Sequence, residues 1–186
     1  MKNVAKDYNN MGIDIIAMDE PILGLLVGRK IMFHSEDFII KTLNNVMSEI
    51  DCLSSVHVCG QVSPNLRDIL LKTNINILDH EFQTNAENFN IFNKSHFERN
   101  DKYLAFGTVK TKIQPKKNSK IDDYVESEKE IKVILKKAIN FYGKQNLFIK
   151  PDCGFLPLRD AFDEDFAYQI ALRKLKNMVS AVRKLR

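Results

Sequence analysis

Two side chains with metal-binding chemistry stand two residues apart in the segment "VHVCG", residues 56–60. The chain has only four histidines and three cysteines, which makes the pairing of His57 with Cys59 notable. The segment is a short apolar run that predicts a strand, and residues i and i+2 of a strand point to the same side. His57 and Cys59 can therefore bind one ion together. The pair alone is a weak signal, because a buried cysteine often serves only as a small apolar residue.

Acidic or thiol side chains also close three other apolar runs of the chain. Zinc prefers thiolate, imidazole and carboxylate ligands in a tetrahedron, so Glu81 and Cys153 would complete a His-Cys-Glu-Cys set with His57 and Cys59. Two thiolates and one carboxylate around a dication leave a net charge of about −1, which favours an electron-rich, nucleophilic thiolate as a further ligand. The residues that close these runs are Asp19, Glu20, Glu81, Asp152 and Cys153.

Neighbouring residues compete for the same role. Asp79 lies two positions before Glu81, so it shares a strand face with Glu81 and is its main competitor as a ligand. His80 is adjacent to Glu81 and is expected on the opposite face. Cys52 follows a predicted helix in a loop and is not expected in the site.

The elements that must position these residues alternate along the chain. Strand followed by helix, repeated every 30–40 residues or so, predicts a parallel sheet with helical crossovers, and its nearly all-apolar strands are typical of a sheet covered on both faces. In a (β/α)₈ barrel the carboxyl ends of the strands form the active face, so the polar residues above are expected on one rim. The predicted strands are residues 13–21, 55–60, 75–82, 103–110 and 146–154, and the predicted helices are residues 36–51, 63–73, 127–143 and the tail from 163.

Composition narrows the class of protein. The chain has 186 residues, 44% hydrophobic and 28% charged, which predicts one globular domain. It has no apolar run of membrane-spanning length and no signal-peptide pattern, so we expect a cytoplasmic protein without a membrane partner. Three cysteines do not predict a disulfide framework. The lysine-rich segments 110–120 and 173–186 are interpreted as solvated surface rather than a nucleic-acid site, and no Gly-rich phosphate loop follows any strand.

Five segments occur in an order that resembles a known family. These segments are "IIAMDEP", "VHVCG", "ILDHEF", "LAFGTVKTK…VES" and "KPDCGFLPLR". They are similar to the catalytic barrel of cobalamin-independent methionine synthase, with the short archaeal-type members the most alike. The resemblance runs from about residue 5 to the C-terminus, so residues 1–186 are interpreted as a single C-terminal part of such a barrel.

The resemblance implies a function and a role for each matching residue. It implies that a methyl group passes to the thiol of homocysteine, with Zn²⁺ bound by His57, Cys59, Glu81 and Cys153. Asp19 would hold the amino group of homocysteine, and Glu81 would yield its place when the substrate sulfur binds, so both count as catalytic. Glu20 and Asp152 are further candidates for substrate binding.

The chain departs from the family pattern in two places. The family barrel has eight strands, whereas the sequence predicts five, an arc with two open edges. We therefore expect a fragment, a partner chain that supplies the remaining strands, or a homodimer. The segment "GTVKTK" also lacks a histidine that longer members carry and that is proposed as a general acid, although Lys110 and Lys112 stand nearby. This absence favours a methylated corrinoid protein over a methylated folate as the methyl donor, and an extended solvated loop is the simpler interpretation.

Two other functions stay open at this point. One is a methylcorrinoid:thiol methyltransferase of the uroporphyrinogen-decarboxylase-like group, which also carries "H-x-C-G"; the segments "PDCG" and "MDEP" speak against it. The other is a non-catalytic, zinc-binding fragment or subunit, which the missing strands suggest.

Overall fold

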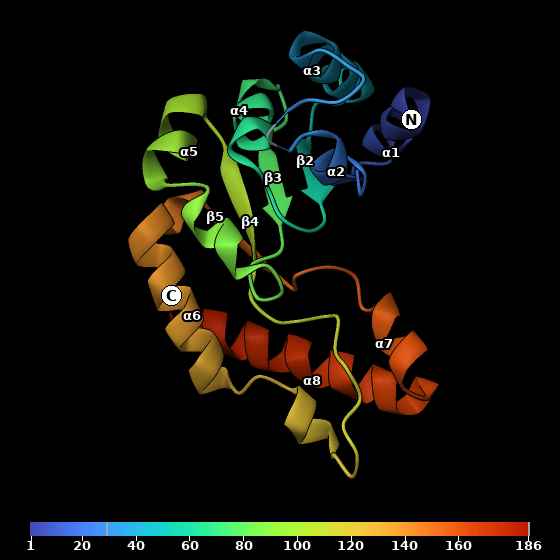
Figure 1. Ribbon diagram of the computed structural model, residues 1–186, viewed down its shortest axis with the longest axis vertical. Coiled ribbons are helices and arrows are strands. Elements are labelled where there is room, and N and C mark those ends of the chain that lie inside the picture. The colour runs from blue at the N-terminus through green and yellow to red at the C-terminus, as the bar shows by residue number, and fades with distance from the viewer. Residues whose placement is uncertain (29, 186) are drawn as a thin grey trace.

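The computed structural model describes residues 1–28 and 30–185 and contains an open, five-stranded parallel sheet (Figure 1). Its spatial order is β1-β2-β3-β4-β5, and all four neighbouring pairs are parallel. Each crossover thus moves one strand further in the same direction, as in a barrel, whereas a doubly wound sheet reverses its order. The strands are β1 Ile15–Asp19, β2 Leu53–Val58, β3 Ile77–His80, β4 Tyr103–Gly107 and β5 Leu147–Lys150.

Helices connect the strands and flank the sheet. The long predicted helices are present, although the first of them ends at Val46 rather than at residue 51. Three short helices, α2, α5 and α7, were not predicted, because four to seven residues are too few to show a helical period. The α-helices are α1 Lys2–Asn10, α2 Leu23–Leu26, α3 Glu36–Val46, α4 Pro64–Lys72, α5 Lys94–Asn100, α6 Glu128–Tyr142, α7 Leu156–Ala161 and α8 Glu164–Arg183, and the 3₁₀ helices are η1 Ala86–Asn90, η2 Ile121–Tyr124 and η3 Lys144–Asn146.

Side-chain oxygens cap the main helices. Ser63 accepts a hydrogen bond from the Leu66 amide, and Pro64 occupies the first turn of α4, where its missing N–H has no cost. Ser127 and Glu130 form a reciprocal capping box at the start of α6. Gly143 ends α6 with φ of 85°, a backbone conformation that favours glycine. Each of these boundaries was readable in the residue types.

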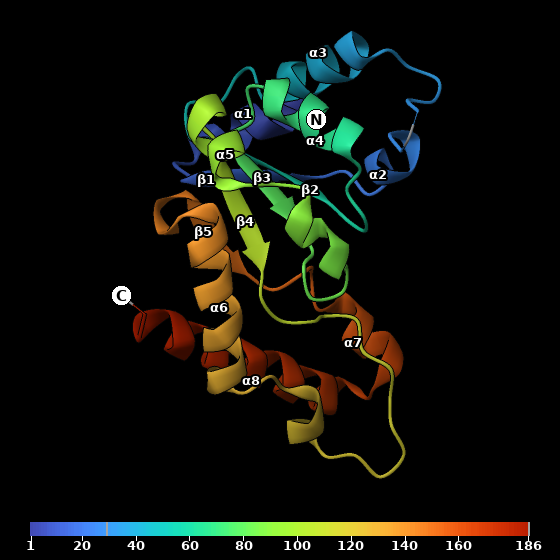
Figure 2. The same ribbon diagram turned by 60° about the vertical axis from the view of Figure 1, so that its left-hand side comes forward.

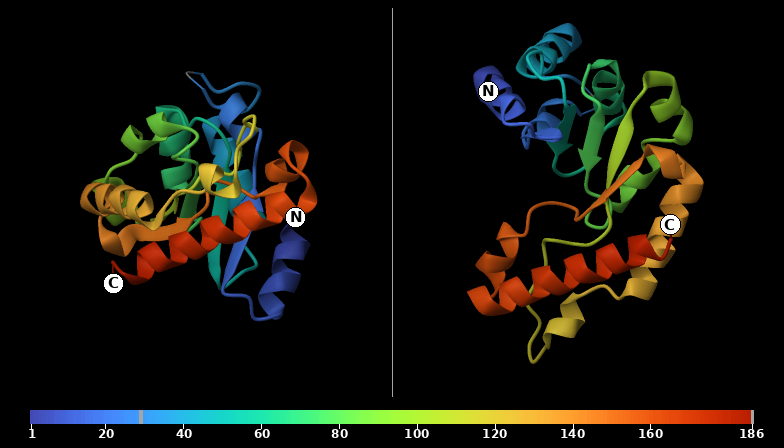
Figure 3. Two further views of the ribbon diagram at one scale, coloured as in Figure 1. Left: turned by 90° about the horizontal axis from the view of Figure 1, so that it is seen from below. Right: turned by 180° about the vertical axis from the view of Figure 1, so that it is seen from behind.

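One face of the sheet packs against α3, α4, α5 and α6 and holds the main hydrophobic core. Val56, Leu78 and Leu104 occupy one row of this face and are fully buried. Figure 3 shows α1 near β1 at one end of the sheet and α6 near β5 at the other. Because side chains alternate along a strand, the opposite face receives the row formed by Asp19, His57 and Asp79.

The polar residues of the strands lie on the opposite face of the sheet. Its row continues from Asp79 to Ala105, so four strands contribute one residue each at the same level. The strands of Figure 1 point towards the part of the molecule that contains α7 and the N-terminal half of α8. The polar strand ends therefore meet on one rim, as the sequence predicted.

The long C-terminal helix packs beside α6 (Figures 1 and 2). The prediction that its basic residues are all solvated is wrong for Lys174, which is fully buried and donates to Glu126 Oε2 at 2.5 Å. Burial lowers the pKa of Lys174, and the Glu126 carboxylate opposes that shift. The ion pair fastens the lysine-rich connection between β4 and α6 to α8, because Glu126 lies at the end of that connection.

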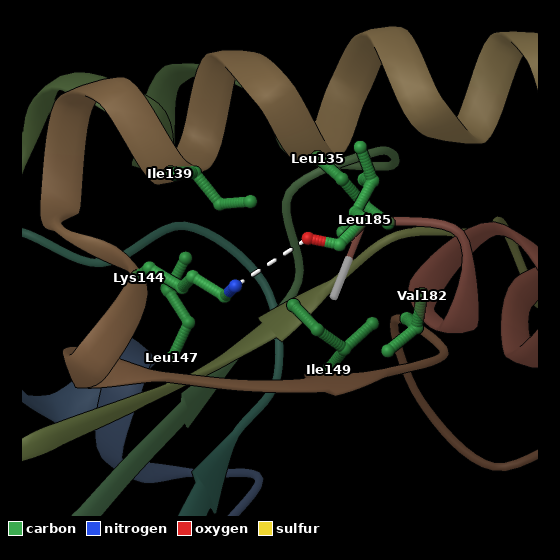
Figure 4. A pocket seen from close by; sticks show the side chains of 7 residues that line it. All are labelled: Leu135, Ile139, Lys144, Leu147, Ile149, Val182 and Leu185. Atoms are coloured by element: carbon green, nitrogen blue, oxygen red, sulfur yellow. Dashed lines mark hydrogen bonds between the residues drawn. The ribbon is translucent and has the colours of Figure 1, made fainter.

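The strands β1 and β5 are the edges of the sheet in residues 1–28 and 30–185. Ile15 of β1 is 40% exposed. Beside β5, an apolar groove lies between α6 and the end of α8, where Lys144 Nζ donates to the Leu185 carbonyl at 3.4 Å (Figure 4).

Over the same described residues, no helix combines the length and the apolar character that crossing a membrane requires.

Candidate metal centre

Four side chains from three strand ends converge at the rim. The ligand atoms of His57, Cys59, Glu81 and Cys153 all lie within 4.8 Å of one another, a grouping that could hold a metal ion. Cys59 Sγ is 3.9 Å from Cys153 Sγ and 3.2 Å from His57 Nε2. His57 is buried, and the other three side chains are partly accessible. The structure thus brings together the four residues that the sequence marked as metal ligands.

His57 is oriented through its other ring nitrogen. Nδ1 donates to Asp79 Oδ1 at 2.6 Å, which leaves Nε2 facing the thiols. A carboxylate in this position fixes the tautomer and the ring orientation of a metal-binding histidine. Asp79, the predicted competitor of Glu81, therefore lies behind His57 and outside the four-residue group.

Glu81 follows β3 directly and is held by the loop that comes after it. Asn85 Nδ2 donates to Glu81 Oε2 at 2.5 Å. The buried Asn88 donates to the carbonyls of Glu81 and Gly60 and accepts from the Val62 amide. Asn88 therefore joins the loop after Cys59 to the loop after Glu81.

Asp152 joins the same loop to the end of β5. Its fully buried carboxylate accepts backbone hydrogen bonds from Phe82, Gln83 and Thr84 at 2.6 to 3.1 Å. A buried carboxylate without such donors would be strongly unfavourable. These hydrogen bonds are with the backbone beside Glu81, so the carboxylate positions the loops that carry Glu81 and Cys153, and a contact of Asp152 with substrate stays a prediction.

The close approach of Asp152 requires glycine on the neighbouring strand. A Cβ built on Gly107 would lie 2.1 Å from Asp152 Oδ1 and 2.9 Å from Asp152 Cα. Real atoms do not approach this closely, so any side chain at residue 107 would displace the backbone next to Cys153.

The thiol of Cys59 is unfavourably placed for ionisation by the protein alone. Burial, followed by the neighbouring Cys153, raises the pKa of Cys59 to about 12. Glu81 and Asp19 act in the same direction. A bound cation reverses this balance, because a metal selects the deprotonated ligand.

Asp19 and Glu20 lie at the rim beside this cluster. Asp19 ends β1, is exposed, and is in register with His57. The Glu20 amide donates to the His57 carbonyl at 2.9 Å, which extends the pairing of β1 with β2. Neither carboxylate belongs to the four-residue group.

Two residues that the sequence placed outside the site lie outside it. His80 is fully buried on the opposite face, where it stacks on Phe92 and its Nδ1 lies 3.3 Å from the Val58 carbonyl. Burial lowers the pKa of His80 to about 4, so it is neutral near pH 7. Cys52 precedes β2, away from the rim. Sequence reasoning missed Asn85, Asn88 and Lys150, whose types and spacing carry no signal for a metal site.

Four potential metal ligands on the carboxyl ends of sequential parallel strands are the arrangement expected of a metal site in a protein of the (β/α)-barrel type. The family model described as "Cobalamin-independent synthase, Catalytic domain" matches residues 1–184. The chain belongs to this family of cobalamin-independent methionine synthase catalytic domains.

Individual relatives agree with this assignment. The methionine synthase of Methanocaldococcus jannaschii is 32% identical over 182 residues, which cover 92% of this chain and 49% of that protein. The methionine synthase of Methanothermobacter thermautotrophicus is also 32% identical and covers 97% of this chain and 50% of that protein. The chain thus spans about half the length of these relatives.

A solved structure supports the fold. The crystal structure of a protein assigned as a vitamin-B12-independent methionine synthase from Listeria monocytogenes superposes with a TM-score of 0.56 at 16% identity. The match covers 92% of this chain and 52% of that chain.

Gly107→Ala should destabilise the chain and loosen the rim, because the new methyl group must displace Asp152. We expect a loss of about 1–3 kcal/mol in the free energy of unfolding, measured by urea denaturation. Gly154→Ala is the matched control, since a Cβ at residue 154 meets nothing within 4 Å. Equal stability of Gly107→Ala and the parent would show that Asp152 does not need this close approach.

Proposed function

We propose that the chain binds one Zn²⁺ at this rim and serves the transfer of a methyl group to the thiol of homocysteine. The observation that carries the proposal is the convergence of two thiols, one imidazole and one carboxylate within 4.8 Å. Relatives of the chain are named methionine synthase, and a Campylobacter jejuni relative is named 5-methyltetrahydropteroyltriglutamate–homocysteine methyltransferase.

The donor set fits zinc. Tetrahedral zinc with Zn–S bonds of about 2.3 Å separates two thiolate sulfurs by about 3.8 Å, and the two sulfurs here lie 3.9 Å apart. Sulfur donors favour zinc over magnesium or calcium, which prefer oxygen. Cys59 and Cys153 are free thiols, as this role requires, and Cys52 is free as well, which supports a reducing, cytoplasmic location.

The residues around the site have separate tasks. Bound zinc would supply the positive charge that keeps the homocysteine sulfur in its nucleophilic thiolate form. His57 is held in place by Asp79, while Cys59 and Cys153 come from separate strand ends. Glu81 is the ligand best suited to yield its position, because Asn85 can keep its carboxylate within reach. Asp19 is exposed on the same rim and is the candidate partner of the homocysteine ammonium group.

The methyl donor would enter from the open side of the rim. A methylated folate and a methylated corrinoid protein are the two candidates, and Lys110 and Lys112 are exposed in the nearby loop where a histidine was absent. A corrinoid is the better leaving group, and its use would need less general-acid assistance. A methylcorrinoid:thiol methyltransferase acting on another thiol is the alternative within the same chemistry.

A non-catalytic zinc-binding subunit is the second candidate function. The half-length match to the relatives and the two sheet edges favour it. In this reading, a partner chain or a second copy would complete the barrel. The whole chain should then behave as a dimer or a complex in light scattering.

Incubation of the purified chain with homocysteine and methylcobalamin or a methylated folate separates the two candidates. Methionine formed above a chelator-treated control supports the enzyme. Bound zinc without product, together with light scattering of a larger assembly, supports the subunit. A stable 21.5 kDa monomer that neither binds zinc nor forms methionine would contradict both.

Zinc content should depend on the two rim cysteines. The purified chain should carry about one zinc, and Cys59→Ser and Cys153→Ser should each remove most of it, because a neutral hydroxyl is a poor substitute for a thiolate ligand. Cys52→Ser is the matched control and should keep the zinc. Metal analysis that finds unchanged zinc in both rim variants would mean that the site is misassigned.

Asp19→Asn should weaken homocysteine binding and spare the metal. A contact between an ammonium and a carboxylate contributes roughly 1.5–3 kcal/mol, so we expect a loss of about ten- to hundredfold in affinity. Titration calorimetry on the zinc-loaded variant measures this loss, and metal analysis provides the control. Equal affinity in variant and parent would exclude Asp19 as the ammonium partner.

A further inference from the structure

Lys150 places a positive charge directly behind the metal centre. It is the last residue of β5, and its side chain is 21% exposed. Its Nζ donates to Asp79 Oδ1 at 2.5 Å and to the Asp152 carbonyl at 2.7 Å, and lies 3.4 Å from His57 Nδ1. Lys150 thus contacts the residue that orients His57 and the residue that precedes Cys153.

A lysine at this position needs a compensating charge. A cation so close to a site for a dication would weaken metal binding by repulsion. Asp79 supplies the compensation, because its single oxygen Oδ1 accepts from both His57 and Lys150. The side chains of Asp79 and His57 are only 13% and 8% exposed, so water screens these charges little.

Without Lys150, the negative charge of Asp79 would have no compensating cation. Two thiolates and Glu81 already exceed the charge of a dication by about one unit. A further unpaired carboxylate behind His57 would add to that excess and would be free to turn away from the ring. Lys150 neutralises the charge of Asp79 and holds its Oδ1 on the side of the imidazole ring.

We propose that Lys150 is a positioning residue that acts on the metal through Asp79, as one half of a matched charge pair behind His57. The inference rests on the proposed metal site and assigns a role to a residue outside its ligand set. A plain structural role is the competing explanation, in which Lys150 only supports the Asp152 carbonyl and acts independently of Asp79.

The two explanations differ in a double-mutant cycle on zinc affinity. Zinc competition with a chromophoric chelator is measured for the parent, Lys150→Met, Asp79→Asn and the double variant. Asp79→Asn should lower the affinity about 10- to 100-fold, the usual loss when the partner of a metal-binding histidine is removed. Lys150→Met in the parent should lower it roughly three- to tenfold, because Asp79 loses its anchor.

The effect of Lys150→Met on zinc affinity should change sign when Asp79 is absent. In the Asp79→Asn background Lys150 is an unpaired cation beside the metal, so Lys150→Met should raise zinc affinity about tenfold. Lys150→Arg keeps the charge and should keep near-parental affinity. Lys144→Met is the matched control in the 3₁₀ helix η3, which directly precedes β5; its Nζ bonds only the Leu185 carbonyl, so the substitution should change nothing.

Cobalt(II) substitution shows whether the ligand set is intact. The thiolate-to-cobalt absorption should keep its intensity in Lys150→Met, while the ligand-field bands shift as His57 reorients. The same fold-change for Lys150→Met in both backgrounds, or a loss of the thiolate absorption, would overturn the proposal. A parent chain that binds zinc but transfers no methyl group affects only the proposed function, whereas one that binds no zinc overturns both.

Discussion

The buried carboxylate of Asp152 is the constraint on which the rim depends. It lies next to Cys153 and accepts three backbone amides of the loop that begins at Glu81. A charge removed from water must find such donors, so the loop after β3 is bound to the end of β5 whether or not a ligand is present. Gly107 makes the approach possible by leaving the space that a side chain would fill. Two potential ligands from different strands thereby keep a fixed separation without touching one another.

The sheet order explains why residues far apart in the chain meet at all. Because every crossover adds the next parallel strand on the same side, the carboxyl ends of β1 to β5 follow one another along a single rim. A polar residue placed directly after an apolar run therefore reaches that rim wherever the run occurs in the sequence. Family membership and the half-length match give this arc its context, since the relatives are about twice as long.

The sequence could predict what depends on residue type and local period. It located the five strands, the long helices and the four converging candidate ligands, because apolar runs, caps and strand-end residues are local signals. Burial of Lys174 was not predictable in this way, since its partner Glu126 is 48 residues away and the surrounding helix is rich in exposed lysine. The roles of Asn88 and Asp152 were equally hidden, because they consist of contacts with backbone groups of distant loops.

The acidic side chains of this rim differ in whether they are hydrogen-bonded within the protein. Backbone amides pair both oxygens of Asp152, while His57 and Lys150 share Oδ1 of Asp79, so both carboxylates are engaged in contacts that support the rim. In contrast, the Asp19 carboxylate has no hydrogen bond or ion pair with any residue that the structure describes, and the two thiols have only each other and His57. An exposed carboxylate without a protein partner and partly buried thiols beside it are the groups of this rim that are free to meet a ligand. Three aspartates of the same rim therefore differ in environment: Asp79 and Asp152 hold neighbouring residues in place, whereas Asp19 faces solvent. The partners of each carboxylate, and not the residue type, set this difference.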